Sequence, residues 1–187
     1  MKGKIFIISG PSGSGKTTLY KKLLESNKDL IKTISVTTRL PREGEQHGRE
    51  YFFVSPKMFQ HKKRAGHFLE SQQVFNNYYG TPKKNVYDLL RQGKNVLMCI
   101  DVKGAEVVWH KFPKAIKIFI KPPSTAILKK RLVSRGSENN EDLELRIKTA
   151  CEELKKAKLY DYVIVNDSLN HAYQKLETVV NKELNRF

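Results

Sequence analysis

The segment Gly10-Pro11-Ser12-Gly13-Ser14-Gly15-Lys16-Thr17 decides the fold of this chain, because it matches the pattern G-x-x-x-x-G-K-[ST] in full. The apolar run Ile5–Ile8 precedes this segment and the helix-patterned stretch Lys16–Glu25 follows it, as the motif requires. Glycines allow the backbone to wrap closely around phosphate oxygens, and the helix directs the positive end of its dipole toward the same anion. The sequence therefore predicts a loop that binds a nucleoside triphosphate.

Three side chains at the end of the loop have predicted roles in that binding. We expect the Lys16 ammonium to bridge the β- and γ-phosphates and the Thr17 hydroxyl to ligate Mg²⁺, with Thr18 completing the ATP-binding set. The motif is compatible with a small-molecule kinase, a nucleotide switch or motor, and a non-catalytic binding module. A kinase needs, in addition, a second site for the acceptor and a means of excluding water.

The rest of the chain alternates short apolar runs with helix-patterned segments. Four runs are predicted to be buried parallel strands: Ile5–Ile8, Val96–Ile100, Ile116–Ile120 and Tyr162–Val165. Six segments are predicted to be helices: Lys16–Glu25, Lys83–Arg91, Gly104–Lys111, Ser124–Arg135, Asn140–Ala157 and Leu169–Leu184. We therefore expect an α/β fold with a parallel sheet flanked by helices.

Two polar segments interrupt this alternation. Ile34–Gly80 is predicted to be an inserted lobe, and Ser134–Glu141 is predicted to be a mobile loop or lid. The expected elements of the lobe are extended pieces and one helix: Ser35–Thr38, Tyr51–Val54, His67–Val74 and Pro56–Ala65.

The composition limits the class of protein. A chain of 187 residues fits one domain, and no apolar run approaches the roughly 18 residues of a membrane-spanning helix. The run Ile5–Ile8 is too short for the core of a signal peptide, so we expect a soluble, cytoplasmic protein with no membrane partner. Two cysteines cannot build a disulfide framework, and the five histidines lack metal-ligand spacing.

The basic excess is large, with 35 Lys and Arg against 19 Asp and Glu and a net charge of +16. Such a charge suits a nucleic-acid binder or a protein that handles small anions. The lysines are dispersed, whereas the arginines include two clusters, namely Arg39 with Arg42 and Arg131 with Arg135 and Arg146. Because the guanidinium group grips phosphate and the chain has no RNP-type motif, we expect small nucleotides and no nucleic acid as partners.

The segment Ser35–Arg42 supplies a candidate acceptor site. Arg39 and Arg42 lie three residues apart on an extended, proline-bounded stretch, where both can face one phosphate monoester. Tyr51 and Tyr79 offer hydroxyl donors. Taken by itself, the segment is explained equally well as a basic surface turn.

These motifs together make the chain resemble guanylate kinase, a family of nucleoside monophosphate kinases. The pairing of S-x-T-T-R-x-P-R with N-Y-Y-G-T is specific to that family, and the resemblance runs in order through essentially the whole chain. The segments that carry it are Gly10–Thr17, Ser35–Arg42, Gly48–Tyr51, Phe68–Glu70, Asn77–Thr81, Ile100–Gly104, Arg131–Gly136 and Val163–Asp167. The resemblance implies a P-loop NTPase fold with an inserted GMP-binding lobe and a lid.

The resemblance also implies a GMP site. The phosphate would be held by Arg39, Arg42, Tyr51 and Tyr79, and the guanine would be surrounded by Ser35, Glu70, Thr81 and Asp101. The chemistry of the base supports this independently, because guanine can donate its N1–H and 2-amino group to an ionised Glu70, whereas adenine would leave that carboxylate unpaired. The alternative for Glu70 is an exposed carboxylate on a strand.

The ATP side and the lid follow from the same resemblance. Arg131, Arg135 and Arg146 resemble the lid arginines, with Arg131 and Arg135 on the ATP and Arg146 reaching the GMP as well. Together with Lys16 and Arg39 they form the predicted catalytic set, since charge neutralisation is the main task in phosphoryl transfer. As an alternative, the lid arginines form surface ion pairs with nearby glutamates. Asn166 would lie near the adenine of ATP.

Three positions carry open questions. Asp101 follows a predicted strand, where ligand groups gather in α/β sheets, and it could face the guanine or serve Mg²⁺ through water. Cys99 stands where the family usually has an acidic residue, so it either alters the Mg²⁺ dependence or packs as a small apolar side chain. Thr81 stands where some members have Ser and keeps the hydroxyl.

The sequence thus predicts an ATP-dependent guanylate kinase that converts ATP and GMP, and also dGMP, to ADP and the nucleoside diphosphate. We expect a single domain over residues 1–187, with a core (1–33, 82–125 and 158–187), a GMP-binding lobe (34–81) and a lid region (126–157). The main rival is an interaction module of the same fold that binds a protein partner, against which the presence of Lys16, Thr17 and the lid arginines argues. Nothing in the pattern favours a monomer over a homo-oligomer.

Overall fold

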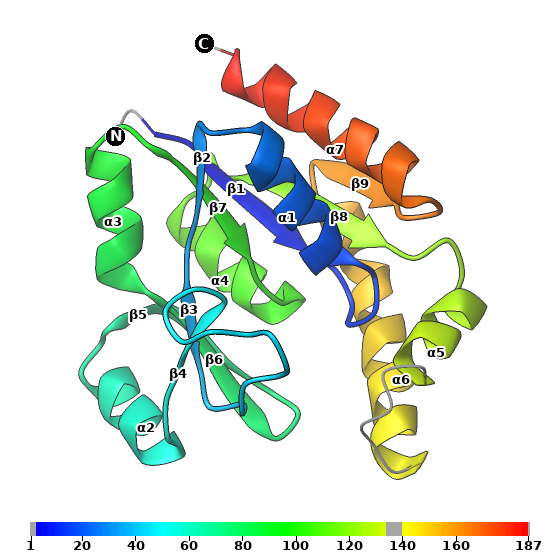
Figure 1. Cartoon of the computed structure of the whole chain (residues 1–187), viewed down its shortest axis with the longest axis horizontal. Coiled ribbons are helices and arrows are strands. Elements are labelled where there is room, and N and C mark those ends of the chain that lie inside the picture. Colours follow the sequence, from blue (N-terminus) through cyan, green and yellow to red (C-terminus); the bar gives the residue numbers. More distant parts are fainter. Residues whose placement is uncertain (1–2, 134–139, 187) are drawn as a thin grey trace.

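The computed structural model describes residues 3–133 and 140–186, and its central element is a parallel five-stranded sheet (Figure 1). The strand order is β2-β7-β1-β8-β9, so β1 lies in the middle and the phosphate-binding loop leaves its carboxyl end. The strands are β1 (Ile5–Ser9), β2 (Leu30–Lys32), β7 (Asn95–Cys99), β8 (Ile116–Lys121) and β9 (Tyr162–Val165).

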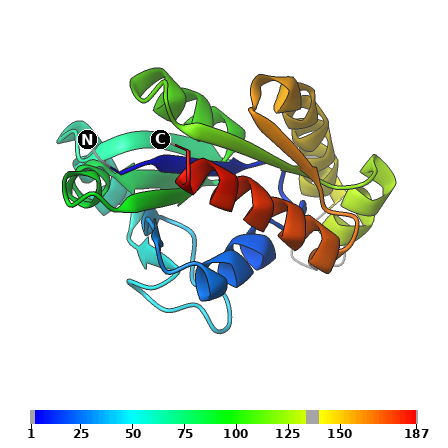
Figure 2. The same ribbon diagram turned by 90° about the horizontal axis from the view of Figure 1, so that it is seen from above.

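Helices cover both faces of this sheet, as the alternation in the sequence predicts (Figure 2). The strand β1 explains the two layers, because its successive side chains point to opposite faces. Phe6 and Ile8 pack against α1 (Lys16–Ser26) and α7 (Leu169–Leu184), whereas Ile5 and Ile7 pack against the opposite layer. That opposite layer contains α3 (Lys83–Arg91), α4 (Val102–Lys111) and part of α6 (Asn140–Lys155). The predicted α/β fold class is confirmed.

A second sheet of four strands forms the inserted lobe, in the order β4-β3-β6-β5. Its elements are β3 (Ser35–Thr37), β4 (Tyr51–Phe53), α2 (Pro56–Arg64), β5 (Phe68–Val74) and β6 (Asn77–Pro82). In Figure 1 the lobe and the helix pair of α5 (Thr125–Val133) and α6 project on the same side of the central sheet. A cavity lies among the lobe, the phosphate-binding loop and α6.

Two strands are absent from the sequence-based expectation. The strand β2 has only three residues, which is too short for an alternation to be visible. The strand β6 contains Gly80 and ends at Pro82, a composition typical of turns. Gly80 is nevertheless required in this strand, since a β-carbon there would lie 2.9 Å from Cδ1 of Phe68.

Most predicted boundaries hold to within one or two residues. Ser124 Oγ accepts a hydrogen bond from the Ile127 amide, and Ser168 Oγ accepts one from the His171 amide, so serine side chains cap the starts of α5 and α7. The helix predicted over Asn140–Ala157 ends at Lys155 and continues as a 3-10 turn, Lys156–Leu159. Within the described ranges, every helix is too short or too polar to cross a lipid bilayer.

Candidate functional site

The phosphate-binding loop adopts a conformation that only glycine tolerates well. Gly13 and Gly15 have φ angles of 83° and 90°, in the left-handed region, which turns successive amide groups toward one side of the loop. The Lys16 Nζ donates hydrogen bonds to the carbonyl oxygens of Gly10, at 2.7 Å, and Pro11, at 3.0 Å. The ammonium group is therefore held above the loop, where an anion in the loop would meet it.

The carboxyl end of β9 anchors the loop from behind. Asn166 Nδ2 donates to the Ser14 carbonyl at 2.8 Å, and a β-carbon on Gly15 would lie only 2.1 Å from that nitrogen. Arg131 Nη2 donates to the Asn166 carbonyl at 3.3 Å, which joins α5 to the same anchor. The buried Asn166 amide thus holds the loop backbone, a structural function that the resemblance does not imply.

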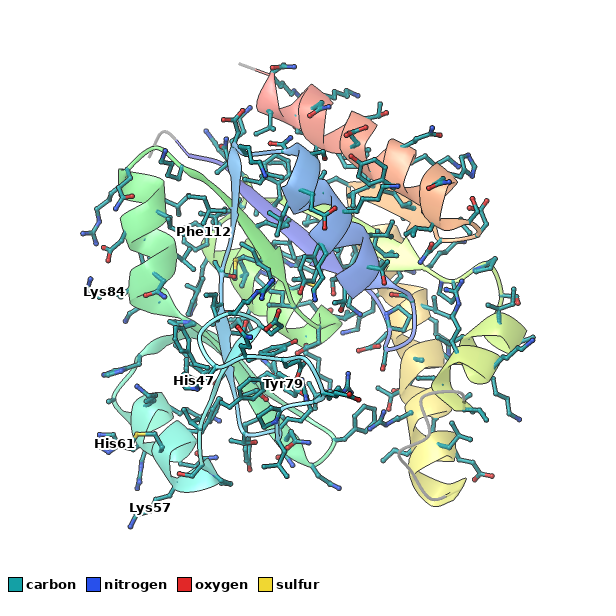
Figure 3. All side chains as sticks on the ribbon, in the orientation of Figure 1. His47, Lys57, His61, Tyr79, Lys84 and Phe112 are labelled. Atoms are coloured by element: carbon teal, nitrogen blue, oxygen red, sulfur yellow. The ribbon has the colours of Figure 1, made fainter. Side chains whose placement is uncertain are left out.

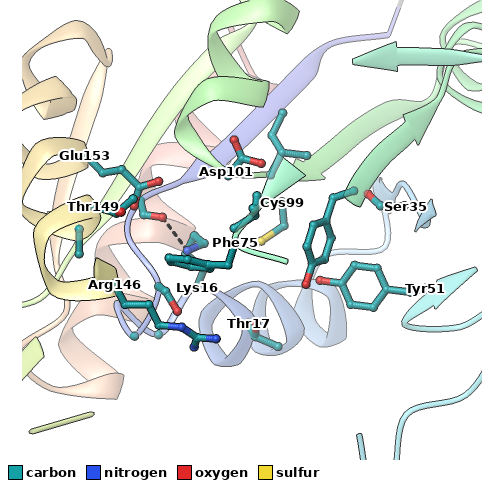
Figure 4. A pocket seen from close by; sticks show the side chains of 18 of the residues that line it. Lys16, Thr17, Ser35, Tyr51, Phe75, Cys99, Asp101, Arg146, Thr149 and Glu153 are labelled. Atoms are coloured by element: carbon teal, nitrogen blue, oxygen red, sulfur yellow. Dashed lines mark hydrogen bonds between the residues drawn. The ribbon is translucent and has the colours of Figure 1, made fainter. Parts of the chain in front are cut away.

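One cavity brings the loop together with the lobe and α6 (Figure 4). Among the residues predicted for the site, those that line it are Gly10, Ser12, Gly13, Gly15, Lys16, Thr17, Thr18, Ser35, Tyr51, Glu70, Tyr79, Asp101 and Arg146. Both predicted substrate sites therefore contribute to a single cavity.

The basic corner of the lobe is built around Arg39. Its Nη2 donates to both carboxylate oxygens of Glu45, at 2.9 and 2.8 Å, and its guanidinium carbon lies 5.5 Å from the centroid of the Tyr51 ring. Burial alone would lower the pKa of Arg39, but the hydrogen bonds with Glu45 and Tyr79 raise it above its usual value. Burial raises the pKa of the Tyr51 hydroxyl, which keeps it protonated and able to donate. Arg42 is exposed and does not line the cavity.

The rings of Tyr51 and Tyr79 meet edge to face on this corner. Their centroids are 6.0 Å apart with an interplanar angle of 70°. Tyr79 lies among the side chains of the lobe sheet, whereas Lys57 and His61 of α2 point to the outside of the lobe (Figure 3). The lysines of α2 do not line the cavity, so only part of the basic excess belongs to it.

A buried carboxylate forms the opposite wall of the lobe. Glu70 is 5% exposed, and its Oε1 accepts a hydrogen bond of 2.6 Å from the Thr81 hydroxyl. Burial raises the pKa of Glu70 to about 7, and the neighbouring Asp101 contributes in the same direction, although the Thr81 hydroxyl opposes the shift. The alternative of an exposed strand carboxylate is wrong.

The start of α4 is shaped around this carboxylate. A β-carbon on Gly104 would lie 2.8 Å from Oε2 of Glu70, so only glycine leaves room for the carboxylate in its present place. Asp101 caps the same helix, since its Oδ1 accepts a hydrogen bond of 2.7 Å from the Gly104 amide. Burial raises the pKa of Asp101, against the effects of that hydrogen bond and of Lys16.

The third wall comes from α6. Arg146, Thr149, Ala150 and Glu153 line the cavity, and their spacing of three, four and seven residues places them on one face of the helix. Glu153 lies close to Lys16 in Figure 4, and burial raises its pKa to about 7 against the effect of Lys16. The sequence argument missed Glu153, although its position seven residues after Arg146 is a usable signal.

Cys99 lies both at the cavity and against the apolar core, the two surroundings that its alternative roles require. Its side chain lines the cavity and also packs against the apolar cluster between the central sheet and α1. Burial raises the pKa of the thiol, with Lys16 and Lys32 opposing the shift. A protonated thiol is a poor nucleophile and a poor ligand for a hard cation, so Cys99 brings no charge to this wall.

The remaining predicted residues that the structure describes do not line the cavity. Pro11, Ser14, Arg39, Arg42, Thr81, Arg131 and Asn166 are not among the residues that line it. Arg135 lies outside the described residues, as do most of the predicted lid loop positions. Besides Thr149, Ala150 and Glu153 of α6, three further lining residues were not predicted: Val74, Phe75 and Ile100. Val74 and Phe75 come from the end of β5 and the turn that follows it.

Comparisons with known proteins agree on one family. The family model for guanylate kinase matches residues 2–183. A guanylate kinase of Syntrophomonas wolfei is 48% identical over 183 residues, covering 97% of this chain and 93% of that protein. One of Oceanobacillus iheyensis is 45% identical over 182 residues, with 97% and 88% covered. The crystal structure of guanylate kinase from Anaplasma phagocytophilum superimposes with a TM-score of 0.82 at 32% identity, covering 98% of this chain and 87% of that one. The chain belongs to the guanylate kinase family.

Proposed function

We propose that the single cavity holds both substrates of a guanylate kinase, with ATP on the Gly10–Thr17 loop and GMP on the lobe. The chain is an ATP-dependent nucleoside monophosphate kinase that transfers the γ-phosphoryl group of ATP to GMP and gives ADP and GDP. The observation that carries the site assignment is the buried Glu70, which lines the same cavity as Lys16. A carboxylate in that position can accept the two N–H groups that distinguish guanine from adenine.

The basic corner of Arg39, Tyr51 and Tyr79 is suited to the phosphate of GMP. Tyr51 and Tyr79 line the cavity, and Arg39 lies against the Tyr51 ring with its charge maintained by Glu45. Hydroxyl and guanidinium donors together suit a dianionic phosphate monoester. Arg42 would join them only after a movement of its exposed side chain toward the cavity.

The donors near the loop fit a magnesium ion. Mg²⁺ prefers oxygen ligands and usually keeps one or two protein contacts, with phosphate oxygens and water completing its shell. Thr17 is exposed and lines the cavity with its hydroxyl-bearing side chain, and Asp101 offers a carboxylate that lines the same cavity. Within the described residues no cluster of three or more Asp, Glu, His or Cys could bind a metal by itself. When bound with ATP, the ion would neutralise charge on the phosphates.

The residues of the chain would then act by position and charge. No covalent nucleophile is needed, because an oxygen of the GMP phosphate can attack the γ-phosphorus directly. Lys16 would stabilise negative charge on the transferred group, and Arg146 would do so from α6. The walls supplied by the lobe and α6 would exclude water, which protects ATP from hydrolysis.

The assignment is tested by ADP formation with a panel of acceptors. We expect turnover with GMP and at least about 100-fold lower kcat/KM with AMP, UMP or CMP, because only guanine satisfies a buried carboxylate. Glu70→Gln should reduce the preference for GMP over AMP while the KM for ATP stays unchanged, and Glu152→Gln at an exposed position of α6 is the matched control. Equal turnover of AMP and GMP by the unaltered enzyme contradicts the site assignment.

A further inference from the structure

The turn between β5 and β6 brings an aromatic ring to the lid helix. The guanidinium carbon of Arg146 lies 4.7 Å from the centroid of the Phe75 ring, and both side chains line the cavity. Figure 4 shows the ring of Phe75 above the Arg146 side chain. This contact joins two segments that are 71 positions apart in the sequence, one in the lobe and one in α6.

The backbone at this ring is unusual. Phe75 has a φ of 53°, and within the described ranges it is the one residue other than glycine with a positive φ. Bulky side chains rarely adopt this conformation, because the β-carbon crowds the carbonyl oxygen, and such strain tends to persist at functional positions. Asparagine adopts a positive φ more readily than phenylalanine, so phenylalanine at this position costs some stability.

We propose that Phe75 is a positioning residue for Arg146, which couples the GMP lobe to the lid helix during phosphoryl transfer. The inference rests on the proposed function, since it takes Arg146 to act on the phosphates. A guanidinium group over an aromatic face is attracted by the ring and retains the N–H groups on its edge for a phosphate. The ring therefore restricts the position of the guanidinium group, and it does so without occupying the N–H donors that would bind the substrate.

A merely apolar role for Phe75 makes a different prediction. If the ring only fills space, leucine at this position should serve nearly as well, since it preserves apolar volume. If the ring positions a cation, tyrosine should serve and leucine should not, because leucine has no aromatic face. Phe75→Leu and Phe75→Tyr are therefore a matched pair.

The decisive experiment measures kcat and KM for both substrates in four proteins: the unaltered enzyme, Phe75→Leu, Arg146→Ala and the double variant. We expect Phe75→Leu to lower kcat/KM for GMP by about 3- to 30-fold, the range expected for loss of a partly desolvated cation–aromatic contact, while the KM for ATP changes less than twofold. Phe75→Tyr should retain at least about half of the activity. In the Arg146→Ala background, Phe75→Leu should have no further effect, because the ring acts through the guanidinium.

The outcomes separate this inference from the proposed function. No GMP-dependent ADP formation by the unaltered enzyme overturns the proposed function itself. If the unaltered enzyme is active but Phe75→Leu has the same kinetics, the positioning role alone is overturned. The same holds if Phe75→Leu lowers kcat/KM for GMP by the same factor in the presence of Arg146 and in the Arg146→Ala background. Phe75→Asn is an independent test. It should relieve the backbone strain, so the melting temperature should stay equal or rise, whereas the activity should fall as it does in Phe75→Leu. A fall in both quantities assigns the residue to packing.

Discussion

Glu45 joins Arg39 to the backbone of Arg42, since its Oε2 accepts hydrogen bonds from Arg39 Nη2 at 2.8 Å and from the Arg42 amide at 2.9 Å. The Arg39 and Glu45 side chains are 15% and 17% exposed, so their ion pair is better shielded from water than an ordinary surface pair. The sequence contains this glutamate between the two segments of the predicted phosphate site. In the structure its carboxylate faces the Arg39 guanidinium group, so it can fix the direction of that side chain.

Loss of the Glu45 charge should weaken GMP binding. We expect Glu45→Gln to raise the KM for GMP by about fivefold with little change in kcat, because Arg39 loses the partner that fixes its direction. The KM for ATP should stay the same. Steady-state kinetics of this variant and of Glu43→Gln, a change at an exposed neighbour, provide the measurement and its control. A lower KM for GMP would show instead that Glu45 competes with the phosphate.

The burial of Glu70 predicts a pH dependence for GMP. Its pKa of about 7 means that the carboxyl is largely protonated at pH 6 and ionised at pH 8, and only the ionised form can accept both N–H groups of guanine. The KM for GMP should therefore fall as the pH rises from 6 to 8. The GMP phosphate also titrates near pH 6, so the same profile for Glu70→Gln is the reference that isolates the carboxyl. Superimposable profiles contradict this explanation.

The same shift predicts how stability depends on pH. The pKa of Glu70 is higher in the folded protein, about 7, than its ordinary value of 4.5, so the folded chain binds a proton that the unfolded chain releases. This contribution to stability is fully present below pH 4.5 and is lost as the pH rises to about 7. Urea titrations should show that Glu70→Gln reduces the loss of unfolding free energy over that interval. A difference confined to higher pH contradicts the shift.

Gly104 should be intolerant of a single methyl group. Alanine ordinarily stabilises a helix by about 1 kcal/mol relative to glycine. At this position its β-carbon would lie 2.8 Å from Glu70 Oε2, so the carboxylate must move. We expect Gly104→Ala to raise the KM for GMP by about tenfold. Gly66→Ala adds a methyl group that meets no neighbouring atom, at a turn with a φ of 66°, so it should strain the backbone and lower stability while leaving the KM for GMP unchanged. Unchanged GMP kinetics in Gly104→Ala would mean that Glu70 shifts without consequence.

Cys99 offers a test of how much charge the metal site requires. Cys99→Asp should place a carboxylate on the cavity wall near Lys16, where the thiol is protonated. We expect the Mg²⁺ concentration for half-maximal activity to fall by about two- to fivefold, as an added hard ligand or neighbouring charge favours the ion. Cys99→Ser keeps the size without the charge and is the control. If serine and aspartate give the same Mg²⁺ titration, the residue contributes only packing.

The sequence predicts local features of this protein better than contacts between distant segments. The strand Ile5–Ser9 and its glycine-rich loop are visible in a short window, because periodicity and turn chemistry are local properties. The approach of Gly104 to Glu70 depends on how α4 lies against the lobe, and no window of the sequence contains both residues. The same holds for Phe75 and Arg146. The composition of β6 also prevented its prediction as a strand. Gly80 suggests a turn in the sequence, whereas in the structure it leaves room for the neighbouring Phe68 ring.

The hydrogen bond from Asn166 to the Ser14 carbonyl has a consequence for the order in which the protein becomes functional. It joins residues separated by 152 positions. A nascent chain that has not yet released β9 from the ribosome has the glycine-rich motif without this anchor. We therefore expect the loop to reach its final conformation only after the segment Tyr162–Asn166 has emerged.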